Sequence, residues 1–245
     1  MKKLYAILFL LLISLSCDNP IDCVTSNGEL VTKEFEFQNF DVINVNSGVK
    51  LVLKQATNYS VSATIGSNFE NDLKISQEGQ SLTLSFNSSC NWVRDFGEIT
   101  VFISAPNITE IHSKTAKDIV SDGILNFLTL RLYSFEDNQS SGTSDFKLQL
   151  QTNEIVIESN SNSRFFLSGT TQNASFNYYN GDARIEAENL IIQNLQVYHR
   201  GSNDMVVKPM QSITGKMVST GNIILKNNPP IIAVQQLYQG QVILN

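Results

Sequence analysis

The sequence predicts an all-β fold built as a parallel β-helix, a solenoid of about 20 residues per coil. Short runs of alternating apolar and polar residues recur along the chain, as half-buried strands require. Apolar and turn-forming residues also keep a twenty-residue period over the second half of the chain. No long window shows the apolar spacing of an amphipathic helix with caps at its ends.

Residues 1–16 are expected to be a signal peptide and to lie outside the fold. Two lysines precede an apolar run, Leu4 to Leu15, which is too short to span a bilayer as a helix, and Cys17 follows directly. The stretch LISLSC resembles a bacterial lipobox, in which the cysteine becomes lipidated after cleavage. Ser14 stands where Leu is usual, and Ser14 and Ser16 also satisfy the small-x-small rule of ordinary secretion.

The charge balance excludes whole classes of partner. Without the two signal-peptide lysines, 15 basic and 23 acidic residues remain, a formal charge of −8. Such a chain is not expected to bind nucleic acid or to adsorb to anionic lipid heads. Membrane attachment would come from the acyl chains on Cys17, and no second stretch is long and apolar enough to span a bilayer.

The other two cysteines, Cys23 and Cys90, form an even pair if Cys17 carries lipid. A disulfide between them would pin the N-terminal tether to the domain of an exported protein, and two free thiols are the alternative. The spacing excludes a CxxC redox or zinc motif.

Residues 17–37 are expected to form a tether leading into a first strand, which leaves residues 38–243 as one domain. Clusters of Asn, Ser and Gly separate the strand-like runs of this domain. The first clear runs are LVLKQ (51–55), YSVSATI (59–65), LKIS (73–76), LTLSF (82–86) and ITVFIS (99–104).

The repeat is visible as columns of residues twenty positions apart. One column holds only turn formers: Ser121, Ser141, Ser161, Gly181, Gly201 and Gly221. The column four places later is apolar except at its second member: Leu125, Asp145, Phe165, Ile185, Met205 and Leu225. Phe146 stands one place beyond that exception, as a one-residue bulge would allow.

Within one coil, Ile185 and Ala187 are expected to point inward, since residues i and i+2 of a strand face the same side. We expect three short strand faces per coil, joined by turns at Gly181, at Asn189 and near Asn194. Stacked coils would then share a continuous apolar column. An antiparallel sandwich explains the alternation equally well, but it does not explain the twenty-residue phase.

The twenty-residue period is weak between residues 38 and 110. This part is expected to be either irregular coils or a cap of antiparallel strands that shields the end of the solenoid.

Several stretches resemble the putative auto-transporter adhesin head GIN domain family (DUF2807). They are FDVINVNSGVKLVLKQATNYSVSA (40–63), LTLSF (82–86), ITVFISAPNITEI (99–111) and STGNIILKNNPPI (219–231). The resemblance covers about residues 38–243 and rests on the order and spacing of loose motifs. The chain departs from the family at HSKTAKDI (112–119), which lacks the glycine of the usual turn.

The resemblance implies a secreted or lipid-anchored, right-handed β-helix from a bacterium of the Bacteroidetes type, with no enzyme activity and no catalytic residues to carry over. The expected location is the cell envelope, as an outer-membrane lipoprotein that faces either the periplasm or the exterior.

Charged residues and histidines do not indicate a catalytic or metal site. Asp145 with Arg164, and Arg184 with Asp204, lie near shared columns on adjacent coils and are expected to be exposed ladder pairs. The two histidines are far apart and lack ligands at metal-binding spacing. No metal and no cofactor is expected.

Tyrosines are the candidate ligand-binding residues. Tyr178, Tyr179 and Tyr198 recur at similar offsets, together with Tyr133, and aromatic faces on a flat sheet can hold sugar rings. The alternative without a binding role is that these rings pack outside corners or against one another. The sequence therefore favours an adhesion or ligand-binding module whose partner is an extended polysaccharide or another envelope protein. A polysaccharide-active enzyme and a purely structural component that stacks end to end are the alternatives.

Overall fold

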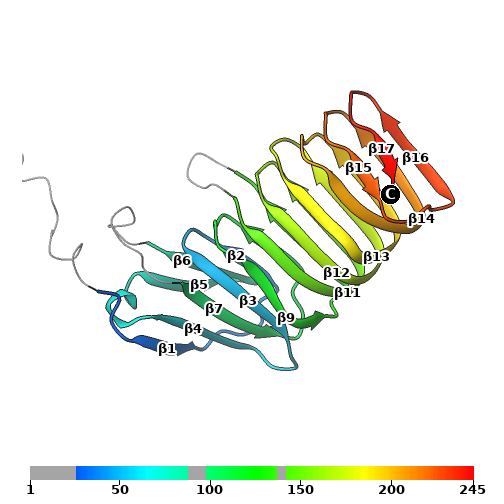
Figure 1. Ribbon diagram of the computed structural model, residues 1–245. Helices are drawn as coiled ribbons and strands as arrows, with labels where there is room; N and C mark the ends of the chain where they lie inside the picture. The colour runs from blue at the N-terminus through cyan, green and yellow to red at the C-terminus, as the bar shows by residue number, and fades with distance from the viewer. Residues whose placement is uncertain (1–25, 88–97, 137–141) are drawn as a thin grey trace, which may run out of the picture.

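Two columns of parallel strands wind the chain into a β-solenoid of about 6 turns with about 21 residues per turn. A computed structural model describes residues 26–87, 98–136 and 142–245 (Figure 1). The predicted signal peptide and Cys17, Cys23 and Cys90 lie outside the described residues. Among the described residues there is no α-helix, and a single 3-10 turn, η2 (Ser67–Phe69), interrupts the strands.

The first column of the solenoid runs in the spatial order β6 (Ser81–Phe86), β2 (Val42–Val45), β8 (Glu110–Ser113), β10 (Thr129–Ser134). It continues through the second halves of β11 (Asp145–Ser159), β12 (Arg164–Tyr178), β13 (Arg184–His199) and β14 (Met205–Met217), and ends at β16 (Ile231–Gln236). All of these neighbours pair in parallel.

The second column runs through β7 (Ile99–Ala105), β3 (Val49–Gln55), β9 (Ile119–Leu125) and the first halves of β11 to β14. It ends at β15 (Ile223–Leu225) and β17 (Val242–Leu244). Each long strand therefore bends to serve both columns, and side chains between the columns form the core.

The predicted apolar file is confirmed. Phe165 pairs with Ile185, and Ile185 pairs with Met205, so that these three fully buried residues lie directly above one another. Paired residues extend the same file across the second column, and all of them are fully buried: Val101, Leu51, Ile119, Phe146, Phe165, Ile185, Met205 and Ile223.

Two details of the predicted coil were wrong. Asn189 and Asn194 lie inside the continuous strand β13, so these corners are bends within a strand and not turns. Register shifts near Ala187 and Ile192 absorb the change of direction. Leu125, predicted in the same column as Phe165, instead pairs with Leu150. The residue of β9 that lies in the Phe165 file is Ile119.

The start of the chain combines coils with a cap, and its strand order explains the poor phase there. The coil β2–β3 lies between the coil β6–β7 and the coil β8–β9, so spatial order departs from sequence order. Three antiparallel strands lie beyond β6 and β7: β1 (Leu30–Phe35), β4 (Ser60–Gly66) and β5 (Leu73–Glu78). Strand β1 falls within residues 17–37, where the sequence predicts a tether that leads into a first strand.

Candidate functional site

An outward-facing row of aromatic side chains crosses the first column of the solenoid. We call it the aromatic ladder and define it as His112, Tyr133, Phe135, Tyr179 and Tyr198. The rings of His112 and Tyr133 stack with centroids 4.4 Å apart and planes 23° apart, and Phe135 lies 6.1 Å beyond Tyr133. The rings of Tyr179 and Tyr198 lie 5.9 Å apart. The ladder therefore spans the coils from β8 to β13.

Register explains why these residues share one face. Tyr133, Glu158, Asn177 and Tyr198 pair in succession on β10, β11, β12 and β13. Their inward neighbours, such as Leu132 and Val197, are buried in the core. Because side chains alternate along a strand, the paired file must face outward. Tyr179, just beyond the end of β12, is 40% exposed, and its contact with the Tyr198 ring places it on the same side.

A carboxylate lies between the two groups of rings. Partial burial and the neighbouring Glu158 carboxylate raise the pKa of the Tyr179 hydroxyl, with smaller effects from Tyr133 and Tyr198. The hydroxyl is protonated at neutral pH, and its hydrogen bond to the Glu158 carboxylate contributes to the raised pKa. At the β8 end, the Glu110 carboxylate lies 2.8 Å from Nε2 of His112. The ladder thus combines flat apolar faces with hydrogen-bonding groups.

Tyr178 is the third predicted ligand-binding residue, and the prediction that it lies on the surface was wrong because it is fully buried. It belongs to an inward file in which Ser159, Tyr178 and His199 pair in succession. The twenty-residue step places Tyr178 beside Tyr198, but the true partner of Tyr198 is Asn177. A slip of one residue moves a side chain to the opposite face of a sheet.

Sequence reasoning also missed Glu158 and Phe135 as members of this face, and it treated His112 as an isolated residue. One signal was available for Tyr178. It lies two residues from Phe176, a core residue, and this spacing places both on the same side of a strand.

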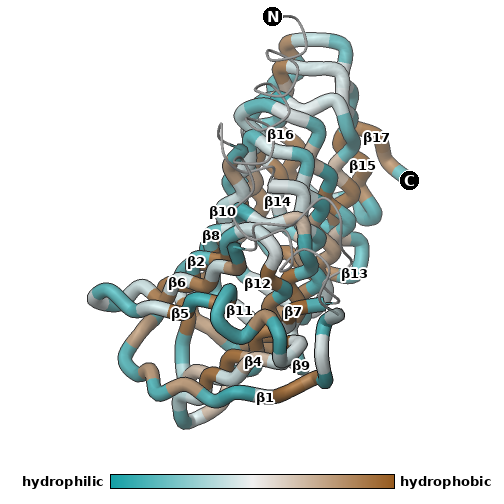
Figure 2. Tube along the Cα trace, turned by 90° about the vertical axis from the view of Figure 1, so that its left-hand side faces the viewer, coloured by the Kyte–Doolittle hydropathy of each residue, from teal (hydrophilic) through white to brown (hydrophobic). Residues whose placement is uncertain are grey.

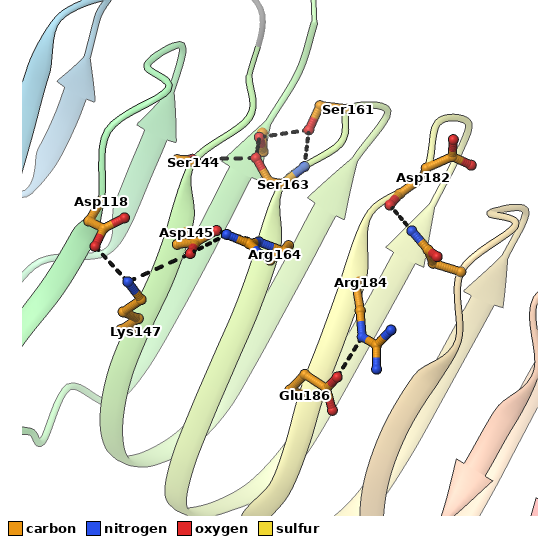
Figure 3. A network of polar contacts seen from close by, with 12 residues as sticks. Asp118, Ser144, Asp145, Lys147, Ser161, Ser163, Arg164, Asp182, Arg184 and Glu186 are labelled. Carbon is orange, nitrogen blue, oxygen red and sulfur yellow. Dashed lines mark hydrogen bonds and ion pairs between the residues drawn. The ribbon is translucent and has the colours of Figure 1, made fainter.

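The inward corner of the coils is polar and fully closed. Six buried serines form a hydrogen-bonded cluster there: Ser113, Ser134, Ser144, Ser159, Ser161 and Ser163. Figure 3 shows part of this cluster at the ends of the strands. The hydroxyls satisfy one another and the backbone, as buried polar groups must. They are closed off from any substrate, so we assign them a packing role.

Two polar atoms of the same corner have no hydrogen-bond partner among the described residues: the Tyr178 hydroxyl and Nε2 of His199. Burial lowers the pKa of His199, while nearby backbone carbonyls of Asn203 and Asn222 oppose the shift. Nδ1 accepts a hydrogen bond from the backbone N–H of Gly201. Within the described ranges, no group of His, Cys, Asp and Glu side chains could hold a metal ion.

Charged side chains form a separate ladder on the second column (Figure 3). Arg164 donates two hydrogen bonds to Asp145, at 2.6 and 2.7 Å. The predicted pair is therefore confirmed, but Asp145 is buried and not exposed as expected. Lys147 lies 2.6 Å from Asp118 and 3.6 Å from Asp145. These neighbours raise the pKa values of Arg164 and Lys147. Such partly exposed pairs typically contribute about 0–1 kcal/mol each.

The second predicted charge pair was wrong. Arg184 contacts Glu186 of its own strand, and Asp204 instead accepts hydrogen bonds from Asn222. A shallow groove of about 410 Å³ lies beside this ladder and includes Lys147, Phe166 and Glu188 in its lining. Since neighbouring residues already pair most of these charges, the groove offers less to a ligand than the aromatic ladder does.

A family model decides the relationship of the chain. The model described as putative auto-transporter adhesin, head GIN domain (DUF2807) matches residues 39–229. The chain belongs to this family. The match covers most of the GIN domain, from the residues just before β2 to the turn before β16.

Solved structures share the fold of this GIN domain. A putative adhesin from Bacteroides fragilis matches with a TM-score of 0.79 and 21% identity, covering 89% of this chain and 97% of that one. A putative adhesin from Parabacteroides merdae has a TM-score of 0.58 and 17% identity, with 89% and 97% of the chains covered. A protein from Parabacteroides distasonis, described as a putative lipid binding protein, matches with a TM-score of 0.62 and 17% identity. The match covers 89% of this chain and 98% of that one.

At these identities the similarity establishes the GIN-domain fold and not a shared ligand. No curated protein matches the chain. The adhesin descriptions of the family and of its structural relatives indicate a protein of the cell envelope or surface. In the part of the chain that the structure describes, no helix has the length and apolar character needed to cross a membrane.

Proposed function

We propose that this GIN-domain protein is a non-enzymatic, lipid-anchored adhesin of the cell envelope that binds an extended neutral glycan along the aromatic ladder. The observation that carries the proposal is the row of outward rings at His112, Tyr133, Tyr179 and Tyr198 on one flat sheet face. The predicted acylation of Cys17 would supply the anchor. Family membership and the adhesin descriptions of the relatives support the envelope location.

The shape of the ladder suits a long ligand better than a small one. Its rings lie on strands that are hydrogen-bonded in register, or directly follow such strands, so they are held at fixed positions along the solenoid axis. Tyrosine is well suited to recognition because its ring is rigid and its hydroxyl can donate or accept a hydrogen bond. A sugar chain lying along the axis would meet apolar faces and hydrogen-bonding groups in turn.

Charge favours a neutral sugar chain over an acidic one. The carboxylates of Glu110 and Glu158 lie beside the ladder rings, and Lys216 pairs with Tyr198 in the same outward file. The whole chain carries a formal charge of −6. Acidic polysaccharides would be repelled by the net charge of the molecule, since like charges lower the rate and strength of association.

Replacing both Tyr179 and Tyr198 by Ala is expected to weaken binding to a neutral polysaccharide by at least about tenfold, because tyrosines at the centre of an interface contribute more than about 1 kcal/mol each. The measurement is affinity electrophoresis against xylan, mannan and mixed-linkage β-glucan, with polygalacturonate as the acidic comparison. Wild-type protein is expected to be retarded by at least one neutral polymer and not by polygalacturonate.

Phe102→Ala is the matched control. Phe102 lies on β7, outside the ladder, and its exposed fraction of 41% matches the 40% of Tyr179. This variant should bind like the wild type. The proposal is wrong if none of the neutral polymers retards the wild-type protein, or if Phe102→Ala weakens binding as much as the double replacement does.

A further inference from the structure

The last coil of the solenoid carries no charged side chain. Residues 227–245 read NNPPIIAVQQLYQGQVILN, without Lys, Arg, Asp or Glu. The preceding coil, in contrast, contains Lys208, Lys216 and Lys226. Several large apolar side chains of the last coil are between 39% and 61% exposed: Ile231, Ile232, Leu237, Tyr238, Ile243 and Leu244. The apolar β17 at this end is brown in Figure 2.

Both strands of this coil leave one edge unpaired among the described residues. Strand β16 pairs with β14, and β17 pairs with β15, and neither has a second neighbour. Leu237 donates its N–H to the Met217 carbonyl, so backbone groups of alternate residues, including Gln236 and Val234, face the free edge. Unpaired edges of this kind readily form β-pairs with another chain.

The opposite end of the solenoid is protected. Its outermost strands, β1 and β5, each pair with only one neighbour. Strand β1 carries Lys33 and Glu34, and β5 carries Lys74 and Glu78. Charged residues on an edge strand are a common device against edge-to-edge association. The last coil lacks this device.

We propose that the last coil, residues 227–245, pairs edge to edge with the last coil of a second copy of the chain and forms a head-to-head dimer. A two-fold axis would place β16 antiparallel to its own copy, so that the free backbone groups of both strands pair. The same contact would cover the exposed apolar side chains of both coils.

Charge restricts where a second copy can bind. Two molecules of formal charge −6 repel each other over most of their surfaces, and the uncharged last coil lets them approach. Head-to-tail stacking would instead place the charged side chains of β1 or β5 in an apolar interface, at a desolvation cost. The contact therefore closes as a dimer and does not propagate into a filament. This inference does not depend on glycan binding.

The test is sedimentation velocity of the full chain over the micromolar range, in a non-ionic detergent because the run Leu4 to Leu15 is apolar. Wild-type protein is expected to show a monomer–dimer equilibrium. Ala233→Lys places a charge on the exposed outer side of β16 and should weaken the dimer by at least about tenfold, since the two copies bring like charges together.

Thr214→Lys is the matched control because Thr214 pairs with Ala233 and is also exposed, but lies one coil inside the free edge. It adds the same charge and should leave the dimer unchanged, and circular dichroism checks that both variants fold. A monomer at all concentrations would overturn the proposal. So would open-ended polymers, a dimer that survives Ala233→Lys, or equal weakening by Thr214→Lys.

Discussion

Replacing Phe165 by Ala is expected to lower the free energy of unfolding by about 3–5 kcal/mol, the usual cost of truncating a buried aromatic residue. Phe165 is fully buried, and its ring stacks on Phe146 with centroids 4.7 Å apart and planes 14° apart. The side chain also lies directly over Ile185 of the next coil. The cavity would therefore interrupt the apolar file in the middle of the solenoid. Denaturant titration followed by circular dichroism measures the change.

Phe166→Ala is the control for this prediction, since it makes the same replacement one residue along the strand. Phe166 faces outward, is only partly buried and lies 5.7 Å from the Arg164 guanidinium. Its loss should cost less than about 1 kcal/mol, as surface replacements usually do. Equal effects of the two variants would contradict the inward and outward assignment of β12.

The second large effect is expected at Gly169, where two coils come closest. Gly169 has φ of 105°, and a Cβ built on it would lie 1.9 Å from the backbone oxygen of Leu150 on the coil below. Backbone strain of this kind costs about 1–3 kcal/mol for a residue other than Gly. The clash with the Leu150 backbone adds to that cost. Gly169→Ala should therefore lower the free energy of unfolding by about 3 kcal/mol or more.

Gly123→Ala separates strain from contact. Gly123 also has a positive φ, 88°, but no atom lies within 4 Å of a Cβ built on it. Only backbone strain destabilises this variant, without a clash, so it should be clearly more stable than Gly169→Ala in the same titration. If the two variants lost equal stability, the close approach of the coils at Gly169 would not be a structural constraint.

The periodic part of the fold could be predicted because its coils keep nearly constant length. Phe165, Ile185 and Met205 are twenty residues apart and pair in register. A fixed step fails wherever a coil gains or loses a residue. Tyr198 pairs with Asn177, 21 positions earlier, and this single extra residue separates Tyr178 from the surface to which sequence reasoning assigned it.

The beginning of the chain could not be predicted from its period. The coil β2–β3 is inserted between two coils that follow it in sequence, so no fixed step connects neighbours there. Strand pairing between segments so far apart in the sequence leaves no local signal. The aromatic ladder depends on the same register. Tyr133 and Tyr198 were visible as candidates, but Glu158 and His112 joined them only when the coils were stacked.

Spin–spin distances along the first column test the stacked coils most directly. The outward file of paired residues includes Asn44, Tyr133 and Lys216, with Tyr133 four coil spacings and Asn44 six from Lys216. With the three native cysteines replaced by Ser, nitroxide labels on cysteines introduced at these sites report two distances from Lys216 by double electron–electron resonance. Coils about 4.8 Å apart predict about 19 Å to Tyr133 and about 29 Å to Asn44. Equal distances, or a shorter one to Asn44, would contradict a single parallel stack.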